Sequence, residues 1–493
     1  MNALLIYPEF PVTFWSFKYA LKFISKKANN PPLGLATIAA LLPPDWNLKL
    51  VDMNVSKLTH RDLKWSDFIL ISAMNAQRDS VINLLDRCKP YHKKIIAGGP
   101  LFTEIPECFP EVDYLILNEA EITLPLFLND LSSGTTKKMY SSKEHPDIRK
   151  SPVPRFDLLE MKKYNTMSIQ FSRGCPYDCE FCEITQLFGR KVRLKTPPQL
   201  IAELDKLYAC NWRGSVFVVD DNFIGNKQVL KKNLLPELRL WMNNKGNPFS
   251  FSTEASVNLA DDSGLMNQMT SAGFNMVFVG IETIEEDSLI ECNKHQNKNR
   301  DLLASVRKIQ DHGLQVTGGF IVGFDNDSPS IFQRQIDFIQ NSGIITAMVG
   351  LLNAPPKTRL YDRLKNENRI THHFQGNNTN FSMNFIPKMK MDDLMTGYKK
   401  ILAGIYSCKP FYDRVRNNLK DFKIKSHPVR FFNYTRIKAL IKSIFILGIY
   451  TKGRSHFWKL IWWSLFNKPG KIGTAITYAI FGYHFRKVFR IRA

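Results

Sequence analysis

Three cysteines in one short segment are the residues best suited to metal chemistry. Cys175, Cys179 and Cys182 lie in MSIQFSRGCPYDCEFCEI, where an apolar strand runs into a loop. Thiolates spaced in this way can wrap around one iron–sulfur cluster, and three thiolates on four irons leave one iron open for an outside ligand. Structural zinc would require a fourth Cys or His at a matching spacing, and none follows. The spacing therefore predicts a 4Fe–4S cluster on these three cysteines.

The remaining cysteines do not form a pattern. Eight cysteines in 493 residues are too few and too scattered for a disulfide scaffold, and Cys210, Cys292 and Cys408 are expected to be small buried hydrophobes. The start, MNALLIYPEF, has no basic region or cleavage site, so we expect a reducing cytoplasmic compartment. The most apolar runs, 443–450 and 472–483, are shorter than the ~18 residues that span a bilayer.

Polar side chains follow the strands predicted after the cysteine loop. These strands run through VFVVDDN, FSTEAS, VFVGIET and GGFIVGF, and each comes after a helix-like segment. Such an alternation predicts a partial (β/α) barrel with its polar residues gathered at the carboxyl ends of the strands. No catalytic triad or acid–base carboxylate pair is evident, so we nominate no catalytic residue beyond the cluster.

The first ~130 residues predict an open parallel sheet wound on both sides. The expected strands are 4–7, 48–51, 68–72, 94–97 and 114–117, and the expected crossover helices are 34–42, 80–87 and 121–131. Ligands of such folds lie at the carboxyl ends of the strands. Gly98 and Gly99 at one of these ends would permit close approach of a ligand, and Glu119 lies at another.

Breaks in periodicity divide the chain. We expect a Rossmann-like domain at 1–135, a polar and proline-bearing linker at 136–160, the partial barrel at 161–390 and a helical basic domain at 391–493. The fold class is therefore α/β with a mainly α-helical C-terminal extension.

The cysteine segment closely resembles the CxxxCxxC motif of the radical S-adenosylmethionine (SAM) superfamily, with Phe181 as the aromatic residue before the last cysteine. The resemblance extends over the strand ends that follow, which in that superfamily contact the amino acid, ribose and adenine of SAM. It implies that SAM is held by Asp220, Asp221, Glu254, Ser256 and Glu282.

The doubly wound domain ahead of the barrel resembles the cobalamin-binding domain of class B radical SAM methyltransferases. Many cobalamin proteins supply a histidine from a DxHxxG motif after the first strand, whereas this chain has Tyr7-Pro8-Glu9 there. The resemblance implies cobalamin at the strand ends with Gly98, Gly99 and Glu119, and without a protein imidazole on cobalt.

Within that branch, PPLGLATIAALLP, VPRFDLL, GRKVRLKTP and GYHFRKVF look most like the group of hopanoid C-2 methylases. The resemblance implies methylation of an unactivated carbon of a small molecule, such as a hopanoid-like lipid. In that chemistry a 5′-deoxyadenosyl radical removes a hydrogen atom, methylcobalamin supplies the methyl group, and flavodoxin or ferredoxin donates electrons.

Two alternatives stay open, and a third is disfavoured. A cobalamin-dependent cyclase or rearranging enzyme would use the radical without methyl transfer, and a non-catalytic Fe–S or cobalamin regulatory protein would need no SAM site. Methylthiolation is disfavoured, because those enzymes bind a second cluster through three N-terminal cysteines and only Cys88 and Cys108 precede the linker.

The net charge of +22 is concentrated toward the C-terminus, where Asp413 and Asp421 are the only acids after residue 410. Lys and Arg there alternate with Phe, Trp and Ile, which suits helices lying on a membrane surface or, equally, a basic cap packed on the barrel. We therefore expect a cytoplasmic protein with peripheral contact to the inner membrane face and no nucleic-acid partner.

Overall fold

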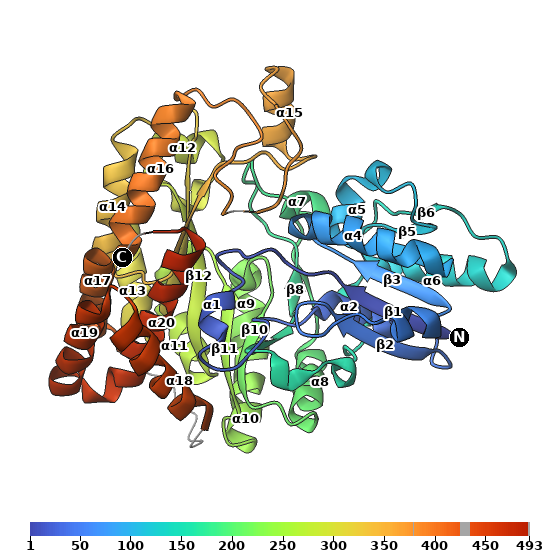
Figure 1. The fold of residues 1–493 in the computed structure, drawn as a ribbon, viewed down its shortest axis with the longest axis horizontal. Coiled ribbons are helices and arrows are strands. Elements are labelled where there is room, and N and C mark those ends of the chain that lie inside the picture. Colours follow the sequence, from blue (N-terminus) through green and yellow to red (C-terminus); the bar gives the residue numbers. More distant parts are fainter. Residues whose placement is uncertain (378, 424–433, 492–493) are drawn as a thin grey trace.

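The computed structural model describes residues 1–377, 379–423 and 434–491. Its N-terminal part is a parallel sheet in the order β2-β1-β3-β4-β5-β6, with helices on both faces (Figure 1). The strands are β1 (Asn2–Tyr7), β2 (Asn47–Asp52), β3 (Phe68–Ser72), β4 (Lys94–Gly98), β5 (Tyr114–Ile116) and β6 (Met139–Tyr140). The helices are α2 (Leu33–Leu41), α3 (His60–Trp65), α4 (Arg78–Cys88), α5 (Pro100–Glu104) and α6 (Ala120–Ser133).

The expected doubly wound sheet is confirmed. Apolar runs such as Ala3–Ile6 are completely buried, because one hydrophobic core lies on each face of the sheet. Two short helices, α3 and α5, were not predicted, and β6 adds a strand from within 136–160.

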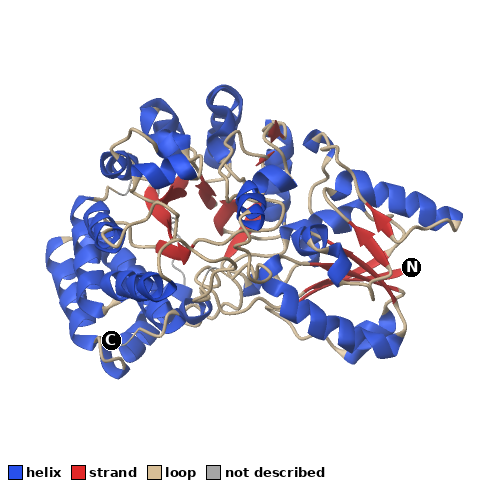
Figure 2. Cartoon of the chain, turned by 90° about the horizontal axis from the view of Figure 1, so that it is seen from above, coloured by secondary structure: helices blue, strands red, loops and turns tan. Residues whose placement is uncertain are grey.

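The second sheet is the predicted partial barrel. Its parallel strands follow the chain order β7-β10-β11-β12-β13-β14 and curve into an arc with helices on the outside (Figure 2). They are β7 (Thr166–Ile169), β10 (Gly214–Val218), β11 (Phe249–Glu254), β12 (Phe274–Glu282), β13 (Gln315–Val322) and β14 (Ala347–Leu351). The helices are α8 (Pro197–Ala209), α9 (Lys227–Val229), α10 (Leu235–Asn244), α11 (Ser263–Ser271), α12 (Glu286–Glu291), α13 (Leu302–Asp311), α14 (Ile331–Ser342) and α15 (Arg359–Asn366).

The C-terminal part is helical, as expected. It consists of α16 (Met391–Tyr406), α17 (Cys408–Asp421), α18 (Tyr434–Phe445), a π-helical turn (Ile446–Tyr450), α19 (Arg454–Asn467) and α20 (Ile472–Val488). These helices share one continuous hydrophobic core with the barrel, and α16 packs against α14. Among the described residues, no helix is both long and apolar enough to cross a bilayer.

The segment between β1 and α2 packs against the C-terminal helices. Between β1 and α2, the chain leaves the first sheet, and α1 (Lys18–Leu21) packs on α20. The ring of Phe14 stacks on Phe485 with centroids 4.3 Å apart, and the Phe14 carbonyl lies 2.9 Å from His484 Nε2. The C-terminal helices are therefore fixed to both the barrel and the N-terminal region.

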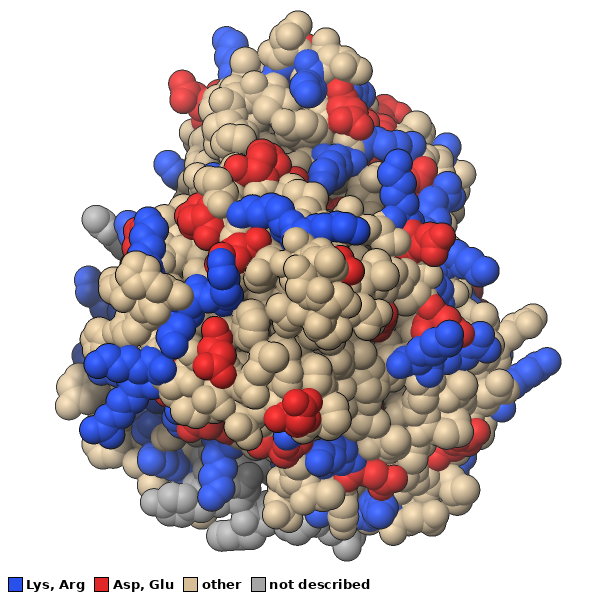
Figure 3. Space-filling view, turned by 90° about the vertical axis from the view of Figure 1, so that its right-hand side faces the viewer, with Lys and Arg blue, Asp and Glu red and all other residues tan. Residues whose placement is uncertain are grey.

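Charges of both signs are mixed on the face that carries the N-terminal sheet. Figure 3 shows Lys and Arg interspersed with Asp and Glu there, without one large basic area.

Candidate active site

The three cysteines lie in the loop that follows β7 and the short strand β8 (Ser172–Arg173). β8 pairs with β9 (Arg193–Leu194), and the loop ends where α7 (Ile184–Leu187) begins. Gly174 has a φ of +89°, and a Cβ there would lie 2.7 Å from the Lys191 carbonyl oxygen. The glycine before Cys175 is thus required by the close approach of the β8–β9 hairpin.

Backbone hydrogen bonds hold the cysteine loop against its neighbours. Cys175 N–H donates to the Gly189 carbonyl at 3.3 Å, and Glu180 N–H donates to the Cys292 carbonyl at 2.9 Å. The Glu180 carboxylate also accepts from Arg363 Nε at 2.7 Å, which ties the loop to α15. The loop is therefore anchored on both sides.

The candidate donor set consists of the three cysteine thiols of this loop. Burial raises the pKa of the Cys175 thiol, and it raises the pKa of the Cys182 thiol to about 12. The neighbouring Cys179 raises the pKa of both thiols further. Bound iron would stabilise these thiolates. Within the described ranges, no group of three or more His, Cys, Asp or Glu side chains is arranged for one metal ion. Three thiolates from one loop can each bind a different iron of a 4Fe–4S cluster, which leaves the fourth iron open for another ligand.

Two of the predicted SAM contacts face the backbone of the cysteine loop. Asp220, completely buried after β10, accepts from Phe171 N–H at 2.8 Å and from the Ser172 hydroxyl at 2.5 Å. Asp221 accepts from Gly174 N–H at 3.0 Å. Burial raises the pKa of Asp220 to about 7 and that of Asp221 to about 6. Both carboxyl groups therefore position the start of the loop.

Ser256 reaches the loop through other polar groups. Its hydroxyl donates to Asn258 Oδ1 at 2.6 Å, and Asn258 Nδ2 donates to the Tyr177 hydroxyl at 2.8 Å. Tyr177 lies between Cys175 and Cys179. A polar chain thus runs from the end of β11 to the cysteine loop.

Glu254 and Glu282 place two carboxyl groups near Lys294, whose charge also acts on Cys175 and Cys182. Burial, then the charges of Asp221 and Glu282, raises the pKa of Glu254 to about 8. Within the described part of the chain, the Glu254 side chain has no ion pair or hydrogen bond. Glu282, in the left-handed region with a φ of +63°, accepts from Lys294 Nζ at 2.7 Å. A cationic ligand such as SAM would relieve the repulsion between the carboxylates.

Sequence reasoning missed Lys294. Burial alone would lower the pKa of its ammonium group, but Glu282 and the Cys179 thiol outweigh burial and raise it. Nearby, Gln296 Nε2 lies 3.8 Å from Cys179 Sγ. No motif marks these residues, because they follow α12 and reach the cysteines only when the chain turns back along the barrel.

The predicted cobalamin contacts lie at the carboxyl edge of the first sheet. A Cβ at Gly98 would lie 2.5 Å from the Ile116 carbonyl oxygen, and one at Gly99, whose φ is +90°, would lie 2.8 Å from Ser72 Oγ. Packing within the sheet thus already requires both glycines. The buried Glu119 carboxylate forms ion pairs with Arg173 and Arg193, both at 2.9 Å, and lies 2.8 Å from His145. Contact of these three residues with cobalamin stays a prediction.

The carboxyl edges of the two sheets face one another. Arg173, at the start of the cysteine loop, binds Glu119 and Glu121 of the first sheet's edge. Lys357, which follows β14, donates to the Thr103 carbonyl at 2.8 Å. Ligands at the two edges would therefore share one space.

Two glutamates that each bury a carboxylate oxygen lie at this junction. Glu104 ends α5, and Glu183 follows the last cysteine; burial and the charge of Glu104 raise the pKa of Glu183 to about 8. Oε1 of each is buried and has no hydrogen-bond partner in the described structure. Both oxygens are free to accept from a ligand.

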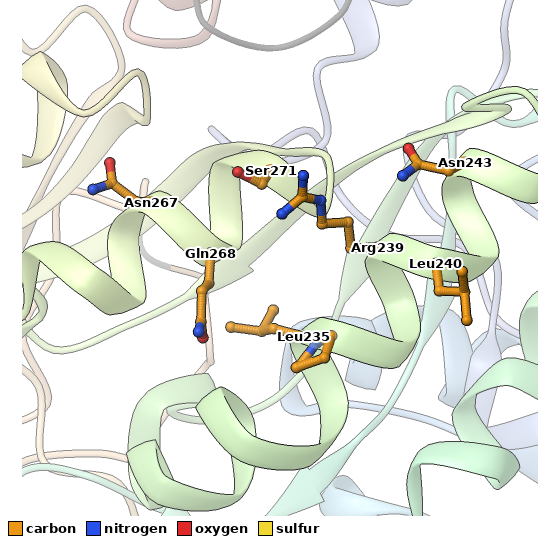
Figure 4. Close-up of a pocket in the computed structure, with 8 residues that line it drawn as sticks. Leu235, Arg239, Leu240, Asn243, Asn267, Gln268 and Ser271 are labelled. Atoms are coloured by element: carbon orange, nitrogen blue, oxygen red, sulfur yellow. The ribbon is translucent and has the colours of Figure 1, made fainter.

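A groove of about 550 Å³ lies elsewhere, between α10 and α11 (Figure 4). Its lining residues include Leu235, Arg239, Gln268 and Ser271, and none of the predicted site residues. The groove lies on the helical layer outside the barrel, so it is separate from the candidate active site.

Comparison with known proteins agrees with this arrangement. Residues 169–339 match the radical SAM superfamily model, and 358–493 match a domain of unknown function, DUF4070. An uncharacterized methyltransferase of Synechocystis sp. is 42% identical, with 98% of this chain and 91% of that protein covered. Hopanoid C-2 methylase of Rhodopseudomonas palustris is 34% identical, with 82% of this chain and 76% of that protein covered.

Solved structures share the fold. The cobalamin-bound radical SAM methyltransferase TsrM of Kitasatospora setae matches with a TM-score of 0.58 at 14% identity, covering 74% of this chain and 75% of TsrM. The cobalamin-dependent radical SAM enzyme OxsB matches with a TM-score of 0.56 at 18% identity, and this chain spans 55% of its length. Together with the cysteine motif and the half-barrel, these findings show that the chain is an enzyme of the radical SAM methyltransferases, in the family that contains hopanoid C-2 methylase.

Proposed function

We propose that this enzyme transfers a methyl group to an unactivated carbon of a small, hopanoid-like lipid, with cobalamin on the first sheet and SAM on the barrel. One observation supports the proposal most strongly: the carboxyl edges of the two sheets face each other. The Arg173–Glu119 ion pair and the hydrogen bond from Lys357 to Thr103 join these edges. A cofactor pair that must act on one substrate needs a common enclosed space.

The cluster and SAM would supply the radical that removes hydrogen from carbon. Cys175, Cys179 and Cys182 hold the cluster in this proposal. Glu254 and Glu282 would receive the cationic groups of SAM, and Lys294 would meet its carboxylate.

Three further candidates complete the SAM end of the site. Ser256 is proposed to contact SAM through its hydroxyl. Asp220 and Asp221 are proposed to contribute by holding the loop on which the cluster is carried.

The residues at the junction suit a corrinoid. A corrin ring carries amide side chains, and their N–H groups match the unpaired acceptor oxygens of Glu104 and Glu183. Gly98, Gly99 and Glu119 would line the same edge. We propose that cobalamin binds without a histidine on cobalt, since Tyr7-Pro8-Glu9 follows β1.

The corresponding domain division is 1–135 for cobalamin, 136–160 as a linker, 161–390 for the cluster and SAM, and 391–493 as the helical domain.

We further propose that flavodoxin or ferredoxin reduces the cluster. Arg190 and Arg359 flank Asp178 of the cysteine loop at 3.7 and 3.4 Å, and both are exposed to an acidic carrier. We also propose that the C-terminal helical domain contacts the inner face of the membrane peripherally.

Product analysis tests the reaction. The protein is purified anaerobically with cobalamin supplied, its iron and cobalt are quantified, and SAM products are measured with a polycyclic lipid. Methylation predicts both 5′-deoxyadenosine and S-adenosylhomocysteine, together with a lipid heavier by one methyl group. 5′-Deoxyadenosine alone would indicate rearrangement or cyclisation, and SAM binding that survives alanine at all three cysteines without turnover would indicate a regulatory protein.

A further inference from the structure

The outward face of α18 carries large apolar side chains that no other described part of the chain covers. Its exposed members are Ile437, Leu440, Ile441 and Phe445. Spacings of three and four residues place them on one face of the helix. On the opposite face, Ala439 and Ser443 are buried against the protein. Surface helices normally turn their apolar face inward, so α18 presents an additional apolar face to the outside.

More exposed apolar side chains follow α18 in the sequence. In the π-helical turn that follows, Ile449 is exposed and Tyr450 is 80% exposed. The C-terminal half of α19 adds Trp462, Leu465 and Phe466, of which Phe466 is 78% exposed. Figure 1 shows α19 at the left edge of the molecule and α18 at its lower edge, both away from the N-terminal sheet. We call the exposed apolar residues of 437–450 and 462–466 the α18–α19 surface.

The charged residues of the helices that carry this surface have one sign. After Asp421 the sequence contains fifteen Lys and Arg residues and no Asp or Glu. Lys438 on α18 and Lys459 on α19 are exposed on the helices that carry the apolar residues. A partner must therefore be apolar where it meets the stripe and anionic around it.

We propose that the α18–α19 surface docks on an anionic lipid bilayer. Its apolar side chains would enter the boundary between headgroups and acyl chains, and its Lys and Arg side chains would lie against lipid phosphates. A second copy of the chain would oppose like charges, and a nucleic acid would leave the apolar stripe uncovered. The link to catalysis rests on the proposed function, because a docked enzyme meets a lipid in the phase where it dissolves.

Vesicle co-sedimentation of the full-length holoenzyme tests the docking. Wild type is expected to bind vesicles rich in phosphatidylglycerol, to bind pure phosphatidylcholine vesicles less, and to release at high salt. Phe445→Ser/Tyr450→Ser is expected to lower the partition coefficient at least about tenfold. Trp462→Ser/Phe466→Ser tests α19 separately. Leu126→Ser, at a residue 50% exposed on α6, should leave binding unchanged.

Unaltered cluster absorption and thermal unfolding confirm that the variants are folded. Equal binding by wild type and both double variants would overturn the proposal, as would absent binding to anionic vesicles. Dimers that both double variants convert to monomers, without vesicle binding, would assign the face to self-association instead. Methylation of a detergent-dispersed lipid is measured in parallel, so that lost docking with intact turnover separates this proposal from the proposed function.

Discussion

Replacing Glu121 by glutamine is predicted to loosen the junction of the two sheets. The Glu121 carboxylate accepts from Arg173 and from the Ser151 hydroxyl, each at 2.7 Å, and its side chain is only 8% exposed. Burial alone would raise the pKa of Glu121. The hydrogen bond and charge of Arg173, with the Ser151 hydroxyl, outweigh burial and lower the pKa from 4.5 to about 2.

That change in pKa sets the size of the effect. Each tenfold change in proton affinity corresponds to about 1.4 kcal/mol, so ionised Glu121 contributes ~3 kcal/mol to the free energy of unfolding at neutral pH. Because the folded pKa lies below the unfolded value, the contribution is complete above pH 4.5 and is lost as the pH falls toward 2. Glu121→Gln should therefore lower the free energy of unfolding by ~2–3 kcal/mol at neutral pH, and by less at about pH 3.

Equilibrium urea unfolding, followed by tryptophan fluorescence under anaerobic conditions, measures this difference at both pH values. Glu107→Gln is the matched control, because Glu107 is exposed and has no ion pair among the described residues. A Glu121→Gln variant within about 0.5 kcal/mol of wild type at neutral pH would refute the reasoning. A deficit of the same size at about pH 3 would refute it equally, since the ionised carboxylate would then not be its source.

Three further changes probe the site. Cys179→Ala should abolish both the cluster absorption and 5′-deoxyadenosine formation, and a variant with full iron content and turnover would contradict its assignment as a ligand. SAM binding by wild type should tighten between about pH 6.5 and 8.5, because a bound cation favours the ionised form of Glu254, whose pKa is about 8; calorimetry should find this dependence flattened in Glu254→Gln. Lys294→Met should weaken SAM binding by about 10- to 100-fold and Lys294→Arg should restore part of it, whereas unchanged affinity in Lys294→Met would remove Lys294 from the SAM site.

The sequence alone predicted most of the strands and the candidate cluster ligands. Apolar runs such as Ala3–Ile6 and Phe68–Ser72 could be recognised as buried strands, because local periodicity and length report burial on both faces of a sheet. The cysteine motif lies within one loop, so its spacing was sufficient to predict a shared cluster. The polar strand ends were found in the same way, since the carboxyl ends of parallel strands meet at one edge.

Only the tertiary structure decided what those residues contact. In the folded protein, Lys294 forms an ion pair with Glu282. The Glu119 carboxylate forms ion pairs with Arg173 and Arg193. Phe14 stacks on Phe485. The tertiary structure also left the apolar stripe of α18 outside the core that the other tail helices share with the barrel. These pairings join residues far apart in the chain. Local patterns cannot predict them, because their free energy depends on charges and surfaces that meet only after the sheets and helices have packed.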